Sequence, residues 1–94
     1  MMDIKDLRKE IDEIDEEIVR AFNRRMEISG KIAGYKKERS LPVFDSVRED
    51  EKIEALRKLS EEEFAVYTEK LYRHIFDLSR EYQSDLIAVE DKTK

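Results

Sequence analysis

Apolar residues recur every three or four positions along the first third of the chain. They are Ile4, Leu7, Ile11, Ile14, Ile18, Ala21, Ile28, Ile32 and Tyr35. This spacing predicts one long amphipathic helix at about residues 5–38, because the pattern meets no proline before Pro42. At about 1.5 Å of rise per residue, such a helix is about 50 Å long. Gly30 and Gly34 lie inside it, and we interpret them as points where a second helix packs closely.

The segment after the long helix is predicted to turn and then to form a second helix. Pro42 disfavours helical backbone at the residue before it, so the first helix ends ahead of this proline. The second helix is expected at about residues 46–59. Ser46 and Glu49 have the spacing of a capping box at its start.

A third helix is predicted at about residues 61–87. Ser60 and Glu63 repeat the capping-box spacing just before it. Its apolar stripe consists of Phe64, Tyr67, Leu71, Ile75, Leu78, Tyr82 and Leu86. The remaining segment, 88–94, shows no periodicity and is expected to be disordered. The hydrophobic pattern therefore predicts a single all-α domain of three helices over residues 1–94.

The predicted helix lengths do not match one another. Helices of about 20 and 40 Å cannot cover a helix of about 50 Å, so a monomer leaves much of the long apolar stripe in water. Exposed apolar surfaces of that size mark interfaces. We therefore expect a homodimer in which the long helices associate. The alternative is an elongated monomeric three-helix bundle.

Composition excludes several classes of protein. The chain has 46% charged residues and a net charge of −5, which argues against nucleic-acid binding because such domains carry a basic surface. It has no cysteine and one histidine, so a thiolate or histidine-rich metal site is excluded. No apolar run approaches the roughly 18 residues that span a bilayer, and the charged start is unlike a signal peptide. We expect a cytoplasmic protein without a metal site.

One cation interrupts the apolar pattern of the first helix. Arg25 occupies a position where the periodicity calls for an apolar residue. A buried guanidinium is unfavourable unless it meets an anion, so Arg25 can bind a ligand or form a buried salt bridge within the protein. A further alternative is a polar residue that sets the register of associating helices. Lys36 lies about 20° around the helix from Arg25 and about 16 Å further along its axis. The two cations can hold a small anion between them, although Lys36 taken alone also suits a solvated surface charge.

Three further polar residues are candidates for the same site. Arg8 precedes Arg25 by about 25 Å of helix axis, too far to reach the same small ligand. In an antiparallel dimer, however, Arg8 would reach a site formed mostly by the partner chain. Ser79 and Gln83 are four residues apart on the third helix, so they point the same way. The alternative for this pair is a polar edge of the core that is bonded to backbone or water.

Charged residues also gather at the start of the second helix. Asp45, Arg48 and Glu49 suit helix capping and local ion pairing. Each candidate thus has a purely structural interpretation. Their order and spacing along the chain are more informative than any one of them.

The complete set resembles the all-α (AroQ) class of chorismate mutases. The opening LRKEIDEID, residues 7–15, is similar to the L-R-x-x-I-x-x-[IL]-D start of that family. The segment RRMEI, residues 24–28, is followed by Lys36 at the family's spacing. PVFDSVRE, residues 42–49, resembles its P-[VI]-x-D-x-x-R-E signature, and SREYQ, residues 79–83, its S-x-x-x-Q pair.

The resemblance covers about residues 4–86 and implies an intertwined homodimer with two active sites, each of which receives one arginine from the partner. The implied reaction is the [3,3] rearrangement of chorismate to prephenate in phenylalanine and tyrosine biosynthesis. This isomerisation needs no cofactor, metal or covalent intermediate. By the same resemblance, Arg25 and the partner's Arg8 bind the two substrate carboxylates through their planar guanidinium groups. Ser79 adds a hydrogen bond to one of these carboxylates.

The resemblance also implies roles for the other candidates. Lys36 and Gln83 donate hydrogen bonds to the ether oxygen, which gains negative charge in the transition state. Glu49 accepts a hydrogen bond from the ring hydroxyl, helped by the backbone at Asp45. Arg48 supports this network.

Two other functions fit parts of the pattern. Isochorismate–pyruvate lyase is a related activity on the same fold with a similar carboxylate-binding pocket, but Glu49, Ser79 and segment 42–49 favour the mutase. A non-enzymatic helical dimerisation module would use the three cations of the first helix in interface salt bridges. Phe76 departs from the family, where this position near the pocket is often aliphatic, so the resemblance does not define the pocket shape there.

Overall fold

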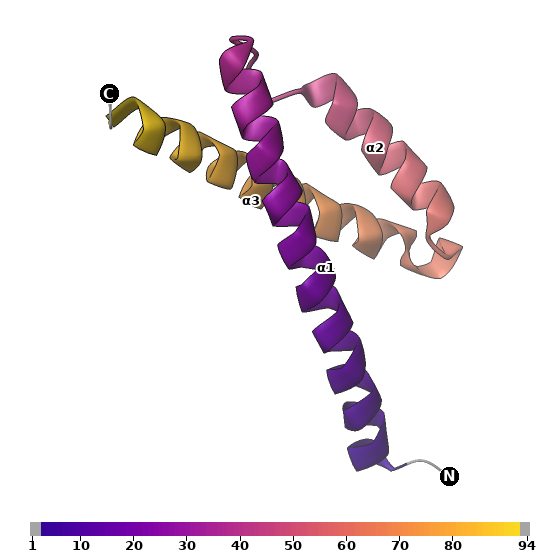
Figure 1. Cartoon of the computed structure of the whole chain (residues 1–94). Helices are drawn as coiled ribbons and strands as arrows, with labels where there is room; N and C mark the ends of the chain where they lie inside the picture. Colours follow the sequence, from indigo (N-terminus) through magenta and orange to yellow (C-terminus); the bar gives the residue numbers. More distant parts are fainter. Residues whose placement is uncertain (1–2, 93–94) are drawn as a thin grey trace.

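The computed structural model describes residues 3–92, which fold into three helices (Figure 1). These are α1 (Ile4–Glu38), α2 (Ser46–Leu59) and α3 (Ala65–Lys92), with one 3-10 turn, η1 (Glu62–Phe64), ahead of α3. No strand occurs in this part of the chain. The predicted all-α class with one very long helix is therefore confirmed. The first two helices lie within one residue of their predicted bounds.

Both ends of α1 are capped by specific hydrogen bonds to backbone groups. At its start, the Asp3 carboxylate accepts from the backbone N–H of Asp6, whose own carboxylate accepts from the Asp3 N–H in a capping box. At its end, Ser40 has a positive φ of 54°. This left-handed residue lets the N–H of Leu41 donate to the Lys36 carbonyl at 2.8 Å, as in a Schellman turn. The chain therefore folds back over the last turn of α1.

The predicted capping box of Ser46 with Glu49 is wrong. Asp45 is the N-cap of α2, and its Oδ1 accepts from the backbone N–H of Arg48 at 3.0 Å. Its carboxylate places a full negative charge at the positive end of the helix dipole, which favours it over the neighbouring serine. The Glu49 side chain is then available for a contact with α3.

The predicted capping box of Ser60 with Glu63 is also wrong. Ser60 closes α2 instead, since its N–H donates to the Leu56 carbonyl at 3.0 Å. Its hydroxyl lies 2.9 Å from the Thr68 hydroxyl and so links α2 to α3. The turn η1 occupies the predicted first turn of the third helix, and α3 therefore begins later, at Ala65.

The C-terminal end of α3 is longer than predicted. Segment 88–94 was expected to be disordered, but α3 continues to Lys92, so the prediction is wrong up to that residue. Residues 93 and 94 lie outside the described part of the chain. Neither glycine nor proline occurs between Ile87 and Lys92. Helical hydrogen bonding therefore propagates beyond the last turn that shows an apolar pattern.

The small core lies between α2 and α3. Ile53, Leu56 and Phe76 form its buried cluster, and Tyr72 packs against them. The ring of Tyr72 meets that of Phe76 edge to face, with centroids 6.0 Å apart. In Figure 1, α2 runs beside the first half of α3, while α1 crosses α3 near its middle.

The close helix approach predicted at two glycines is found at only one of them. A Cβ on Gly30 would lie 3.3 Å from Tyr82 Cε2 and 3.4 Å from Leu86 Cδ1, so the absence of a side chain lets α3 cross here. A Cβ on Gly34 meets no described atom within 4 Å. The interpretation is therefore wrong for Gly34 within the single chain.

The N-terminal half of α1 extends beyond the other two helices (Figure 1). Its apolar positions are 44–61% exposed: Ile4, Leu7, Ile11, Ile14 and Ile18. The Cα radius of gyration is 17.0 Å, whereas a compact chain of this length has about 12 Å. The mismatch in helix length predicted from the sequence is therefore present in the fold.

Two leucines of α2 provide a matched test of this core. Leu56 is 8% exposed and belongs to the buried cluster, whereas Leu59 is 83% exposed on the same helix. We expect Leu56→Ala to lower the free energy of unfolding by about 2–4 kcal/mol, through lost burial and the cavity left behind. Leu59→Ala should change it by less than about 0.5 kcal/mol. Denaturant titration followed by circular dichroism measures both, and equal effects would contradict this description of the core.

Candidate active site

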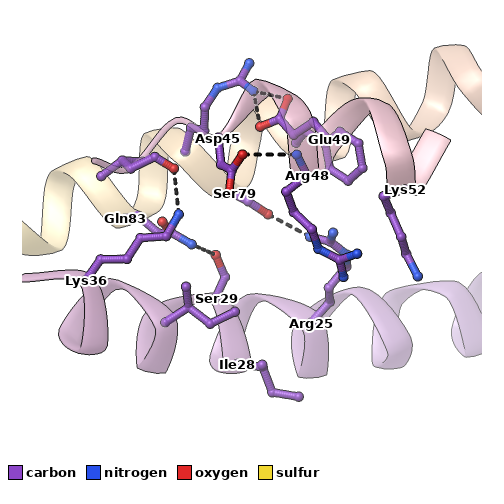
Figure 2. A pocket seen from close by; sticks show the side chains of 14 residues that line it. Arg25, Ile28, Ser29, Lys36, Asp45, Arg48, Glu49, Lys52, Ser79 and Gln83 are labelled. Carbon is purple, nitrogen blue, oxygen red and sulfur yellow. Dashed lines mark hydrogen bonds and ion pairs between the residues drawn. The ribbon is translucent and has the colours of Figure 1, made fainter. Parts of the chain in front are cut away.

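α1, the start of α2 and α3 surround a cavity of about 430 Å³ (Figure 2). This volume suits a small molecule. Seven of the eight predicted site residues line the cavity: Arg25, Lys36, Asp45, Arg48, Glu49, Ser79 and Gln83. The eighth, Arg8, is exposed on the N-terminal half of α1 and does not line it. A single chain therefore brings together every candidate except the arginine that spacing had assigned to a partner.

Arg25 reaches the cavity from α1. Its Nη1 donates to Ser79 Oγ on α3 at 2.8 Å. Its guanidinium carbon lies 5.4 Å from the ring centroid of Phe76 and 6.0 Å from that of Tyr72. No carboxylate of residues 3–92 forms an ion pair with it, so the alternative of a salt bridge within the chain is excluded for these residues. The remaining N–H groups of this half-buried cation are available to an anion.

Lys36 enters from the last turn of α1. Its Nζ donates to the backbone carbonyl of Val43 at 2.8 Å, which ties the loop before α2 to α1. One of its three N–H donors is thus used, and the ammonium group is held in place. Figure 2 shows Lys36 and Gln83 at one end of the cavity, with Arg25 at the other end.

Gln83 and Ser79 come from successive turns of α3 and are 6% and 8% exposed. The Gln83 Nε2 donates to Ser29 Oγ on α1 at 2.9 Å. Its Oε1 is buried and has no hydrogen-bond partner among the described residues. Ser29 itself is 4% exposed. Two buried polar side chains from different helices therefore meet at the cavity wall.

Glu49 is held by a cation that sequence reasoning did not identify. Nη1 of Arg80, on α3, donates to both carboxylate oxygens of Glu49 at 2.5 Å, and Nη2 pairs with Asp77. The guanidinium also stacks on the ring of Phe44, 4.8 Å from its centroid. Hydrogen bonding to the Glu49 carboxylate raises the pKa of Arg80 above its usual value. The contact with Arg80 thereby orients the Glu49 side chain at the cavity wall.

Positive charge predominates in the cavity. Five cations line it, namely Arg25, Lys36, Arg48, Lys52 and Arg80, against the two carboxylates of Asp45 and Glu49. Both carboxylates already have partners, in the helix cap and in Arg80. The side chains of Arg48 and Lys52 form no ion pair with any residue of the described chain. All of the five cations except Arg80 thus lack a carboxylate partner among residues 3–92. In a protein of net charge −5, this concentration of cations favours an anion with more than one negative charge.

Three polar residues that line the cavity were absent from the predicted site: Ser29, Lys52 and Arg80. Ser29 lies four residues after Arg25 and seven before Lys36, a spacing that puts all three on one face of α1 and would have identified it. Lys52 similarly follows Arg48 by four residues. Arg80 carried no such signal, because its contact with Glu49 depends on how α2 packs on α3.

The donor set limits the chemistry of the cavity. Residues 3–92 contain no group of three side chains that could hold a metal ion. Ser79 accepts from Arg25 and directs its hydroxyl toward Met26 Sδ, so its partners among residues 3–92 include no base that would activate it as a nucleophile. Oriented hydrogen-bond donors and cations are well suited to binding a small polyanion and to stabilising charge that develops on it. Over the same residues, no helix has the length and apolar character of a membrane span.

These features define the class of the protein: it is all-α, and its cavity is lined by cations that suit a small polyanion. Comparison with known families places the chain within it: residues 7–84 match the family model of chorismate mutase type II. The chain belongs to this family. The resemblance inferred from the motifs is thereby confirmed, and the matched range includes all eight predicted site residues.

The chain is similar to parts of two longer curated relatives. A bifunctional chorismate mutase/prephenate dehydratase of Aquifex aeolicus is 37% identical over 95 aligned residues, which cover 100% of this chain and 25% of the relative. The T-protein of Haemophilus influenzae is 35% identical over 54 residues, which cover 57% of this chain and 14% of the relative. The chain therefore spans a quarter or less of these proteins. No solved structure matches it.

Proposed function

We propose that this chain is a chorismate mutase, an isomerase that rearranges chorismate to prephenate on the route to phenylalanine and tyrosine. The observation that carries the proposal is the position of two donor groups at opposite ends of one cavity (Figure 2). Arg25 with Ser79 lies at one end, and Lys36 with Gln83 at the other. Chorismate carries two carboxylates and an ether oxygen, so it presents acceptors to both groups. The similarity to the bifunctional chorismate mutase/prephenate dehydratase of Aquifex aeolicus supports the same activity.

The arginine end of the cavity would bind carboxylate. Arg25 keeps free N–H groups, and its contact with Ser79 fixes the plane of the guanidinium. A planar guanidinium binds carboxylate through two parallel hydrogen bonds, which also orients the substrate. Arg48, which lines the cavity from α2, would add positive charge for the substrate.

The lysine end would act on the breaking bond. The ether oxygen of chorismate gains negative charge in the transition state, and hydrogen bonds from Lys36 and Gln83 strengthen as it does so. A preorganised donor needs little rearrangement during the reaction, and the Lys36 contact with Val43 supplies that preorganisation. Glu49, held by Arg80, would accept from the ring hydroxyl, helped by the backbone at Asp45. No step requires a metal, a cofactor or a covalent intermediate.

A second copy of the chain would complete the site. Arg8 lies about 25 Å along α1 from Arg25, so it cannot reach the same small ligand. The exposed apolar stripe of the N-terminal half of α1 suits association of two long helices, as does the extended shape of the chain. We propose an intertwined homodimer in which each cavity receives Arg8 of the partner subunit. A cytoplasmic location remains a prediction from the sequence.

The direct test is an assay of the purified chain with two substrates in the presence of a chelator. We expect loss of chorismate absorbance together with formation of prephenate, identified by proton NMR, because the reaction needs no metal. Isochorismate should release pyruvate far more slowly than chorismate is consumed. Preferential turnover of isochorismate would favour the lyase. Failure of either substrate to react, together with failure to bind a bicyclic dicarboxylate analogue of the transition state, would favour a non-enzymatic module.

A further inference from the structure

The contact between Ser29 and Gln83 joins two of the most buried polar side chains of the protein. Ser29 is 4% exposed and Gln83 is 6% exposed, and they meet where α1 crosses α3. In this contact the Gln83 Nε2 donates to Ser29 Oγ at 2.9 Å. The carbonyl oxygen Oε1 is left buried without a partner among the described residues. The amide thus has one satisfied end and one unsatisfied end beside the cavity.

The same contact accommodates the opposite orientation of the amide. A serine hydroxyl both donates and accepts, so rotating the Gln83 amide by about 180° lets Ser29 donate to Oε1 instead. The Nε2 group then occupies the place of the unpaired oxygen, and its N–H bonds are available to a ligand acceptor. Leaving a buried carbonyl unpaired is unfavourable, and the rotation removes this cost once a ligand accepts from Nε2.

A bound substrate would favour the orientation of the Gln83 amide in which Nε2 faces the ligand. An ether oxygen only accepts hydrogen bonds, so it is repelled by Oε1 and attracted by Nε2. Lys36, the other donor at this end, is already positioned by Val43. Within the described part of the chain, the Gln83 side chain has a hydrogen bond to Ser29 and to no other residue.

We propose that Ser29 is a positioning residue of the active site, which donates its hydroxyl proton to Oε1 of Gln83 and so turns Nε2 toward the ether oxygen of the substrate. This inference rests on the proposed mutase function. Ser29 itself acts through Gln83 and does not touch the reacting atoms. Its effect belongs to the transition state, where the ether oxygen is most negative and the Nε2 hydrogen bond is strongest.

A double-mutant cycle on the full-length chain tests this role. We expect Ser29→Ala to lower kcat by about tenfold, the worth of one neutral hydrogen bond, with KM changed by less than about twofold. Gln83→Ala should lower kcat by about 100-fold. In the Gln83→Ala background, Ser29→Ala should cost less than about twofold more, because the residue through which Ser29 acts is gone. Ser84→Ala, an exposed serine next to Gln83 on α3, is the matched control and should match the wild type.

Several outcomes would overturn the proposal. An equal loss from Ser29→Ala in both backgrounds would show that the serine acts independently of Gln83, as a merely structural residue does. A higher kcat in Ser29→Ala would show that Ser29 holds the amide with its carbonyl toward the substrate. Unchanged kcat in Ser29→Ala, with Gln83→Ala impaired, would refute the role of Ser29 alone. Absence of chorismate turnover by the wild type would instead refute the proposed function, and thermal melts of each variant separate loss of folding from these results.

Discussion

Lys36→Ala is expected to lower kcat for chorismate about 100- to 1000-fold, the cost of removing one preorganised donor from a developing negative charge. The Lys36 ammonium is held by the Val43 carbonyl at 2.8 Å, and it lies at the same end of the cavity as Gln83 (Figure 2). In the proposed mechanism, its hydrogen bond to the ether oxygen would be stronger in the transition state than in bound chorismate. The loss should therefore appear in kcat more than in KM. Initial rates of chorismate consumption measure both constants.

An exposed lysine of the same helix controls for the change of charge. Lys31 is exposed on α1 and does not line the cavity, so Lys31→Ala should retain wild-type turnover within about twofold. Circular dichroism should show that both variants keep their helical content. Turnover of Lys36→Ala near the wild-type value would exclude Lys36 as a catalytic residue.

Arg25→Ala is expected to lower kcat/KM by about 100- to 1000-fold, because in the proposed site a substrate carboxylate would then lose its half-buried partner. Arg25→Lys should recover little of this loss, since a lysine cannot form the paired hydrogen bonds of a guanidinium. Arg24→Ala is the matched control, because Arg24 is the exposed neighbour of Arg25 on α1. Binding of a dicarboxylate transition-state analogue, followed by calorimetry, should weaken in parallel with kcat/KM. Tight analogue binding by Arg25→Ala would contradict the assignment.

The long first helix could be predicted from sequence because its pattern extends over many turns without an interruption. The helix ends could not be predicted with the same accuracy. Ser46 and Ser60 both have capping-box spacing, but Asp45 provides a stronger cap for α2, and the Ser60 hydroxyl bonds to Thr68. Several neighbouring side chains can cap the same helix end, and the spacing of residues alone does not show which of them forms the hydrogen bond.

Much of the candidate site could be predicted from the sequence, because several of its residues lie in pairs on one helix. Arg25 and Lys36 share one helix, and Ser79 and Gln83 share another, so spacing alone puts each pair on one face. The pairing of Arg80 with Glu49 was not accessible, because it arises where α2 and α3 meet. Contacts within a helix follow from its period, whereas contacts between helices depend on packing.

At Gly34 the sequence predicted a contact between helices that the structure does not contain. Its position next to Gly30 on the face of α1 suggested a second close contact, but α3 crosses only at Gly30. A crossing helix meets α1 over a short distance, so two glycines about 6 Å apart along the axis need not both lie in the contact. A glycine in the sequence therefore shows where a second helix could pack closely. Which glycine is in contact depends on where α3 crosses α1.

The central claim is that each active site is built from two chains, and subunit exchange tests it most directly. Arg8→Ala and Arg25→Ala are each expected to be nearly inactive as homodimers. A heterodimer of the two contains one site with both arginines intact and one site with neither. An equimolar mixture, unfolded and refolded together, should therefore recover about one quarter of wild-type activity, because about half of the dimers are mixed and each has one working site. Purified heterodimers that remain inactive would contradict a site shared between chains.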